Sequence, residues 1–500
     1  MNTERTKSAR LGEVTQFLRK EAVAVIFVIL AIIFFLVSGM EFPYVLEQVL
    51  LRLAQNSFLV LALIIPVIAG MGLNFSITVG AMAAQIAMFL ITNWAHQTGS
   101  PVFSGASGFL LAVLITVPMS VLFGFLAGKL LNRTKGQEMI AGMILGYFAN
   151  GIYMFIFLIL FGGIIKIDDT ALIISGGVGV KNSFDVSVTG ALDELFSARL
   201  AVAVPLAACI LLLWLVGRAL RTGKKPVPAV LAWLPMVLSG ALLLAHAVLY
   251  SSDCAWLPYL RYAGLAIAVL TAAAAFVLAA GKKIRLSAGQ TAGVGLLLAV
   301  SIALALLDQF THGRTPLRTF LKINVPISTY LVIGLLCMLN TFLFKTKIGQ
   351  SLRTVGQSMA VATASGISVD NVRIFAIVLS TVFAGIGQLI YLQSIGVVQT
   401  YSAHSNVALY SIAALLVGGA SVTRANNKQA LFGVLIFHTI LVVLPYAVGK
   451  IFSDSQDTEY FRAFMLYSVI CFSLISHVVS TRRSRTRAAA EAAEEAEVQS

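Results

Sequence analysis

The segment from Thr346 to Arg373 reads TKIGQSLRTVGQSMAVATASGISVDNVR, a long polar stretch between two apolar runs of the chain. Its apolar residues recur at the spacing of one helical face: Leu352, Val355, Met359 and Ala362. Gly366 is placed to end this helix in a left-handed conformation, and Ser368 to cap the next one. The pattern predicts a short amphipathic helix on a membrane face, although on periodicity alone an ordinary connection between two spans is the better explanation.

The composition is too apolar for a globule that is dissolved in water. Apolar residues make up 59% of the 500 residues and charged residues 11%, and the mean hydropathy is +0.92. A helix needs about 20 apolar residues to cross about 30 Å of hydrocarbon, and lipid tolerates only helices and closed barrels. The apolar runs are continuous, which excludes the alternating pattern of a barrel. The sequence therefore predicts an all-α, polytopic membrane protein.

We expect about fourteen transmembrane helices, with both termini in the cytoplasm. Lys and Arg gather in the loops on one side of this arrangement, whereas the long loop 163–198 on the other side is acidic. One loop disagrees, because Arg314, Arg318 and Lys322 fall outside, so a missed or extra span near it would also fit. The expected helices are 22–39, 53–72, 76–95, 107–131, 139–162, 199–219, 229–250, 259–280, 289–307, 326–344, 371–395, 405–422, 429–449 and 460–480.

The net charge of +14 does not indicate a nucleic-acid partner, because Lys and Arg form short clusters between apolar runs. The four cysteines stand singly and show neither a disulfide framework nor a metal-binding spacing. The first apolar run, Ala22 to Val37, is expected to be a retained span. We divide the chain into a cytoplasmic segment 1–21, a first half 22–200, inserted helices 201–325, a second half 326–480 with a loop 346–370, and a cytoplasmic tail 481–500.

The order of residues in the Thr346 segment resembles the ATPase-coupling loop of ATP-binding-cassette (ABC) importer permeases. The resemblance is to the ribose-permease-like branch, which serves branched-chain amino acids, simple sugars and nucleosides. Gln357, Ser358 and Met359 depart from that family, which often has a polar residue and Pro there. The resemblance implies that these residues couple to an ATPase: Gly349, Leu352, Arg353, Gly356, Met359, Ala362, Ser365 and Gly366.

Three further motifs resemble the same family. They are GMGLNFSITVGAMAAQ at Gly70–Gln85, KGQEMIAGMILGYFANGIYMFIF at Lys135–Phe157, and YSIAALLVGGASVTRANNKQALFGVLIFHTIL at Tyr410–Leu441. Gly146 replaces a usual Asn, and Arg424–Asn427 replaces a Gly-rich turn. Helix packing through small residues explains the first motif equally well on spacing alone. The inserted helices are the largest departure, because the family usually passes through one helix there.

Polar residues within apolar spans are the candidates for a solute path. Neutral hydrogen-bonding groups and aromatic rings suit an uncharged, polyhydroxylated or heterocyclic solute, although pairing between helices is the commoner role for any single one of them. Asn406 and Tyr410 belong to a wider set of candidates. The main candidates are Asn74, Ser76, Thr78, Tyr147, Asn150, Gln388, Tyr391 and Gln393.

The sequence contains no G-x-x-x-x-G-K-[ST] motif for ATP phosphates and scarcely any Asp or Glu within the expected spans. The resemblance therefore implies that this chain binds no cofactor, is not an enzyme, and relies on separate ATPase subunits that use ATP. It also implies a second permease subunit, identical or not, and an extracytoplasmic solute-binding protein or lipoprotein. The expected location is the bacterial cytoplasmic (inner) membrane, with lipid around the helices.

The leading hypothesis is the permease subunit of an importer for a nucleoside, a simple sugar or a nucleoside-like vitamin such as riboflavin. The alternative is a self-contained secondary carrier or facilitator for a small polar solute, in which the Thr346 segment is only a connection. A membrane-embedded enzyme is a weaker third possibility, because it needs catalytic side chains grouped at one interface.

Overall fold

The computed structural model describes residues 22–203 (except 168, 176, 201 and 202), 263, 266, 267, 299, 323–451, 459–472 and 475. The chain divides into two compact units, Met1–Leu195 with Ser328–Ser500, and Phe196–Ile327. In the second unit, β2 (Ala198–Arg199) pairs antiparallel with β3 (Asn324–Val325). The boundaries 201 and 325 predicted for the insertion lie close to this division, but the predicted helices between them lie outside the described residues.

The first unit is helical, as the continuous apolar runs predict. Six described helices are long and apolar enough to cross a membrane, and a seventh counts if α14 and α15, bent by 74°, form one span. The number fourteen and the side on which the termini lie stay predictions. The helices are α2 (Ala22–Ser38), α3 (Phe42–Ala62), α4 (Ile64–Ile68), α5 (Ile77–Thr98), α6 (Gly105–Arg133), α7 (Glu138–Phe155, then a π-helical turn Ile156–Leu160), α8 (Leu192–Leu195), α14 (Ile327–Leu343), α15 (Lys347–Gln357), α16 (Met359–Ala364), α17 (Val369–Ile395), α18 (Val407–Val417) and α19 (Asn427–Ile451).

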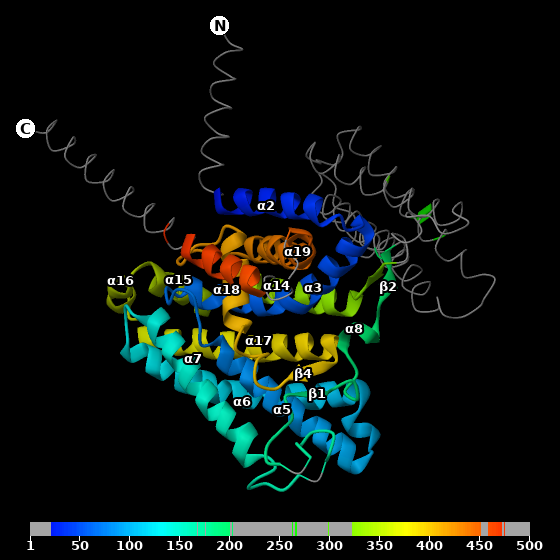
Figure 1. The fold of residues 1–500 in the computed structure, drawn as a ribbon. Coiled ribbons are helices and arrows are strands. Elements are labelled where there is room, and N and C mark those ends of the chain that lie inside the picture. The colour runs from blue at the N-terminus through cyan, green and yellow to red at the C-terminus, as the bar shows by residue number, and fades with distance from the viewer. Residues whose placement is uncertain are drawn as a thin grey trace, which may run out of the picture. The chain divides into compact units, whose positions relative to one another are not determined.

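Short elements join these helices at one end of the unit. The 3-10 turn Pro101–Phe103 links α5 to α6, and β1 (Ser183–Asp185) pairs antiparallel with β4 (Val397–Gln399). Along the chain, α15 and α16 come before α17, and β4 comes directly after α17. Figure 1 accordingly shows α15 and α16 at one end of the yellow helix α17, and β4 and β1 at the other.

The second predicted span, 53–72, differs from the structure at both ends. α3 begins at Phe42, because Pro43 stands in its first turn, where a missing N–H costs nothing. The helix breaks at Leu63, and α4 continues only to Ile68. Gly70 and Gly72 then adopt φ angles of +75° and +70°, which glycine tolerates and other residues rarely adopt. The glycines of the sequence therefore allow the non-helical backbone between α4 and α5.

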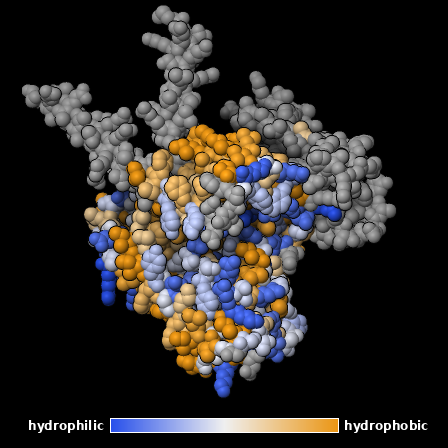
Figure 2. Space-filling view, in the orientation of Figure 1, coloured by the Kyte–Doolittle hydropathy of each residue, from blue (hydrophilic) through white to orange (hydrophobic). Residues whose placement is uncertain are grey.

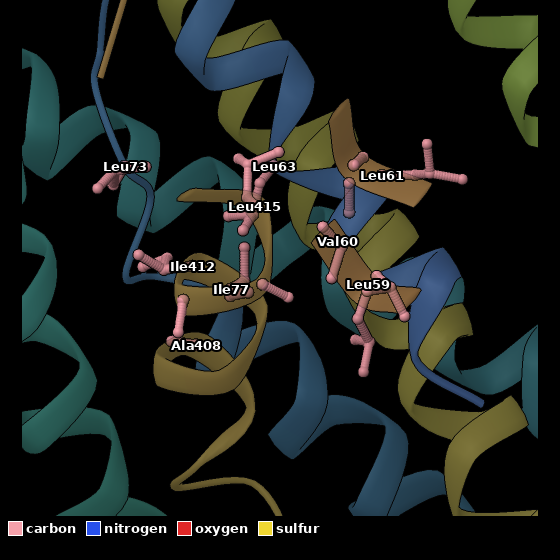
Figure 3. Packing of buried hydrophobic residues seen from close by; sticks show 14 of the residues in the cluster. Leu59, Val60, Leu61, Leu63, Leu73, Ile77, Ala408, Ile412 and Leu415 are labelled. Atoms are coloured by element: carbon pink, nitrogen blue, oxygen red, sulfur yellow. The ribbon is translucent and has the colours of Figure 1, made fainter. Parts of the chain in front are cut away.

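The buried core lies around this break. Figure 3 shows Leu63, where α3 breaks, next to Leu415 of α18, and Leu59 and Leu61 of α3 belong to the same buried cluster. Backbones approach closely elsewhere in the unit: a Cβ atom added at Gly80 of α5 would lie 2.3 Å from the carbonyl oxygen of Thr381 in α17. Small residues at such crossings allow the close van der Waals packing that holds membrane helices together.

Large apolar side chains also cover the outside of several helices. α2 exposes Ile29, Ile32 and Leu36, and Figure 2 shows orange side chains gathered over α2. α6, α7 and α14 likewise expose many Leu, Ile and Phe side chains. Such a surface is stable only in an apolar solvent, so the described helices form a multi-pass membrane protein.

Candidate functional site

A cavity of about 490 Å³ lies among α3, α17, α18, α19, the connection between α17 and α18, and the helical segment 459–472. Its size falls within the range of about 300–1,000 Å³ that is usual for small-molecule sites. Two predicted path residues, Gln388 and Tyr391, line it, together with Asn406 and Tyr410. The other polar residues of its wall are Gln48, Arg52, Gln55, Asn56, Gln399, Ser402, Ser411, His438 and Arg462.

Two side chains of the wall have polar atoms that need a partner. Gln388 has an exposed fraction of 0%, and neither its Nε2 nor its Oε1 is hydrogen-bonded. His438 is 4% exposed, and its Nδ1 is also unpaired. A buried polar group without a partner costs roughly 1–3 kcal/mol, so a wall built in this way favours a polar molecule in the cavity.

The charged side chains among the described residues of the cavity wall are positive. Arg52 of α3 and Arg462 both line it, whereas no Asp or Glu is among its described lining residues. Arg462 forms an ion pair with Glu459, one turn earlier in the same helix. Arg52 has no ion pair with any described residue.

The polar residues of the Gly70 motif serve the break between α4 and α5 and do not line this cavity. Asn74 Oδ1 accepts from the backbone N–H of Ser76 at 3.1 Å and from its hydroxyl at 2.5 Å, and Asn74 Nδ2 donates to Ser380 Oγ at 3.3 Å. The Thr78 hydroxyl donates to the Phe75 carbonyl at 3.2 Å. These bonds replace the missing helical ones and tie the break to α17.

The remaining predicted path residues also lie away from the cavity. Gln393 donates to the Thr189 carbonyl at 3.0 Å. Tyr147 is 77% exposed on the outer surface of α7. Asn150 Oδ1 lies 2.7 Å from Nε2 of His404, in the connection between α17 and α18. A role of these three residues in the solute path stays a prediction.

His404 joins α5 and α7 through a buried network. Burial lowers the pKa of His404 to about 4, so its ring is neutral at pH 7 and carries one proton. Its Nδ1 lies 2.9 Å from Gln85 Oε1, while Gln85 Nε2 has no partner. Turning the Gln85 amide over lets Nε2 donate to Nδ1 and leaves Nε2 of His404 to donate to Asn150.

The Thr346 segment forms two helices where the sequence predicts one. Ser358 interrupts it, because its hydroxyl accepts from the backbone N–H of Val361 at 3.3 Å and caps α16. Thr346 caps α15 in the same way, through the N–H of Gly349 at 3.3 Å. Gly366 has the predicted positive φ, +75°. Of the predicted apolar stripe, Leu352, Val355 and Ala362 are buried and Met359 is half-buried.

Two glycines bring α15 against the break that follows α4. A Cβ atom added at Gly356 would lie 2.0 Å from the carbonyl oxygen of Ile68, and one added at Gly70 would lie 2.7 Å from Cα of Gly356. Real Cβ atoms do not approach backbone atoms so closely, so only glycine fits at this crossing. α15 is therefore packed directly against the backbone between α4 and α5.

A buried ion pair connects α16, α7 and α17. Arg373 of α17 is 0% exposed, and its Nη2 lies 2.6 Å from Oε1 of Glu138, the first residue of α7. Its Nε donates to Asn132 Oδ1 at 2.9 Å, and its Nη1 lies 3.4 Å from the sulfur of Met359 in α16. The sequence suggested no role for Arg373, because the charge lies in the first turn of a span, where a surface position is usual.

Sequence reasoning also missed much of the cavity wall. Arg52 precedes the predicted start of the second span by one residue, so it was expected in a loop. His438 lies in the middle of the predicted span 429–449, and a ring nitrogen in so apolar a run is a signal that could have identified it. Among the described residues, no group of three or more His, Cys, Asp and Glu side chains could hold a metal ion.

Comparisons with known proteins agree with the motifs. A family model described as branched-chain amino acid transport system / permease component matches residues 227–473, and so begins within the segment predicted as an insertion. No solved structure matches the chain. The nucleoside ABC transporter permease protein NupC of Lactococcus lactis subsp. cremoris is 33% identical over 130 residues, 26% of this chain and 37% of that protein.

Two further relatives are similar over comparable lengths. The xylose transport system permease protein XylH of Haemophilus influenzae is 33% identical over 23% of this chain and 30% of its own length. The guanosine ABC transporter permease protein NupQ of Bacillus subtilis is 30% identical over 22% and 34%. The chain thus matches about a third of the length of these relatives. These matches confirm that the chain is similar to ABC transporter permeases for nucleosides and simple sugars, as its motifs predict.

Proposed function

We propose that this chain is the membrane-spanning subunit of an ATP-driven importer for a nucleoside, a simple sugar or a nucleoside-like vitamin such as riboflavin. The observation that carries the proposal is the placement of the cavity and the Thr346 segment at different ends of one helix. Gln388 lies 19 residues beyond Val369, the first residue of α17, or about 28 Å along the helix. The cavity is where a solute binds, and α15 and α16 are where an ATPase acts.

The close packing of α15 supplies a route for force. ATPase subunits bind the exposed face of α15 and α16, which includes Arg353, and their closure on ATP displaces these helices. The Gly356 contact transmits the displacement to the break after α4, and the Asn74 bond transmits it from the break to Ser380 of α17. Because α17 also carries Gln388, its movement changes the wall of the cavity.

The proposed partners supply the functions that this chain does not perform itself. ATP is bound and hydrolysed by the separate ATPase subunits, and this chain binds no cofactor. A second permease subunit, identical or related, completes the path, and an extracytoplasmic solute-binding protein or lipoprotein delivers the solute. We place the assembly in the bacterial cytoplasmic membrane, with α15 and α16 on the cytoplasmic side.

Uptake into proteoliposomes tests the proposal. The chain is reconstituted with the ATPase, permease and solute-binding proteins that are proposed as its partners, and radiolabelled inosine, xylose and riboflavin are offered in turn. We expect uptake of at least one probe that requires both ATP and the ATPase, because the energy source lies outside this chain. Uptake that persists without the ATPase and follows an ion gradient would contradict the proposal and favour a secondary carrier.

A further inference from the structure

The described wall of the solute cavity contains two guanidinium groups and no carboxylate. The guanidinium groups are those of Arg52 and Arg462, which both line the cavity. Glu459, which pairs with Arg462, is a surface residue with a side chain that is 62% exposed. Arg52 has no such partner within the described part of the chain, so among the charges of the described wall it is the one that no carboxylate balances.

A carboxylate near the cavity is already engaged elsewhere. Asp193 Oδ2 accepts from the hydroxyl of Ser394 at 2.6 Å, and Ser394 Oγ accepts in turn from Gln55 Nε2 at 3.0 Å. Gln55 belongs to the cavity wall, whereas Asp193 and Ser394 do not. These hydrogen bonds orient the Gln55 amide, and they do not involve the guanidinium of Arg52.

The neutral groups of the wall complement an acceptor-rich ligand. Gln388 offers an unpaired, fully buried amide N–H₂ from α17, and Tyr391 and Tyr410 bring hydroxyl groups to the same cavity. Arg presents several N–H donors in one plane and binds carboxylate and phosphate groups through two parallel hydrogen bonds. An Arg and an amide that share one cavity wall, and that have no side-chain partner among the described residues, are therefore a combination suited to an oxyanion.

The geometry points to a solute that carries an oxyanion, either a carboxylate or a phosphate, with Arg52 as the residue that selects for it and Gln388 as a second donor. This inference rests on the proposed function and narrows it: the transported molecule is an acidic relative of a nucleoside or a sugar. A cavity of about 490 Å³ has room for such a molecule. Arg462, already paired with Glu459, contributes less selectivity.

Matched pairs of neutral and anionic probes test this inference in the same reconstituted assembly. The pairs are inosine with inosine monophosphate, which carries a phosphate, and xylose with xylonate, which carries a carboxylate. We expect ATP-dependent uptake of an anionic member to exceed that of its neutral partner by roughly tenfold or more, which is the discrimination that one lost charge-assisted pair produces. The pair that responds identifies the oxyanion.

Substitutions of Arg52 test whether its charge, and not a general loss of folding, determines uptake of the anionic probe. Arg52→Gln is expected to lower uptake of the anionic probe by roughly tenfold or more, and Arg52→Lys to retain part of it as a point charge. Arg133→Gln, at an exposed position at the end of α6, is the matched control and leaves uptake unchanged. Gel filtration of each purified variant checks that it is folded.

Different outcomes of these experiments contradict the selection of an oxyanion and the proposed importer function. ATP-dependent uptake of a neutral probe that equals or exceeds uptake of its anionic partner overturns this inference and leaves the proposed function standing. The same holds if Arg52→Gln leaves uptake of the anionic probe unchanged. Absence of ATP-dependent uptake of all four probes by the complete assembly counts against the inference and the proposed function together.

Discussion

Gly356→Ala is expected to lower ATP-driven uptake by roughly tenfold or more, because forcing a methyl group into this crossing costs about 1–3 kcal/mol unless the helices separate. The added Cβ atom would lie 2.0 Å from the carbonyl oxygen of Ile68, which is backbone and cannot rotate away. α15 must therefore move off the break after α4, and force from the ATPase no longer reaches it. Uptake and ATP hydrolysis are measured on the same reconstituted sample, and hydrolysis is expected to continue.

Gly151→Ala is the matched control for this substitution. Gly151 lies within α7, and an added Cβ atom meets nothing within 4 Å there. Alanine also has the higher helix propensity, so this variant should transport normally. Normal uptake by Gly356→Ala would show that α15 does not act through its contact with Ile68.

Glu138→Gln is expected to lower the free energy of unfolding by about 3–5 kcal/mol, because it leaves a buried charge without its counter-ion. The guanidinium of Arg373 is fully buried, and after the substitution the groups beside it, from Asn132, Met359 and the new amide, are all uncharged. The loss also removes the ion pair that holds the start of α7 against α17. We therefore expect the coupling of ATP hydrolysis to uptake to weaken together with the stability of the chain. Chemical unfolding of the purified protein in detergent, followed by circular dichroism, measures the change.

Lys135→Gln is the matched control for Glu138→Gln, because it breaks an exposed ion pair in the same region. Lys135 pairs with Asp370 at 2.6 Å, but the two side chains are 45% and 63% exposed. Exposed pairs contribute about 0–1 kcal/mol, so this variant should unfold almost as the unmodified chain does. Equal unfolding free energies for the two variants would mean that the Arg373 pair is not a structural link between α7 and α17.

The sequence predicts the helices well because lipid imposes a strict rule on them. A run of about 20 apolar residues has few alternatives to a spanning helix, so most predicted spans in the described part of the chain lie near an observed helix. The exceptions come from local chemistry that hydropathy does not record. Pro43 allows α3 to begin at Phe42, and the hydroxyl of Ser358 caps α16 and divides the predicted amphipathic helix.

The cavity was harder to predict because it depends on which helix faces meet. Gln388 and Asn74 are both polar residues in apolar surroundings, and the sequence assigns both to the solute path. Only packing distinguishes them: Asn74 bonds with Ser76 and Ser380, whereas Gln388 has no partner. Arg52 was missed for a related reason, since a charge next to a predicted boundary is expected at the surface.

Thiol labelling of α16 tests the central claim, that α15 and α16 lie on the cytoplasmic face and receive the ATPase. Val361 is 57% exposed, and Val361→Cys is made in a chain whose four native cysteines are replaced by serine. A membrane-impermeant maleimide should label this cysteine in inside-out vesicles stripped of the ATPase, and the returning ATPase should protect it. Labelling only from the outer face, or labelling that the ATPase leaves unchanged, would contradict the account.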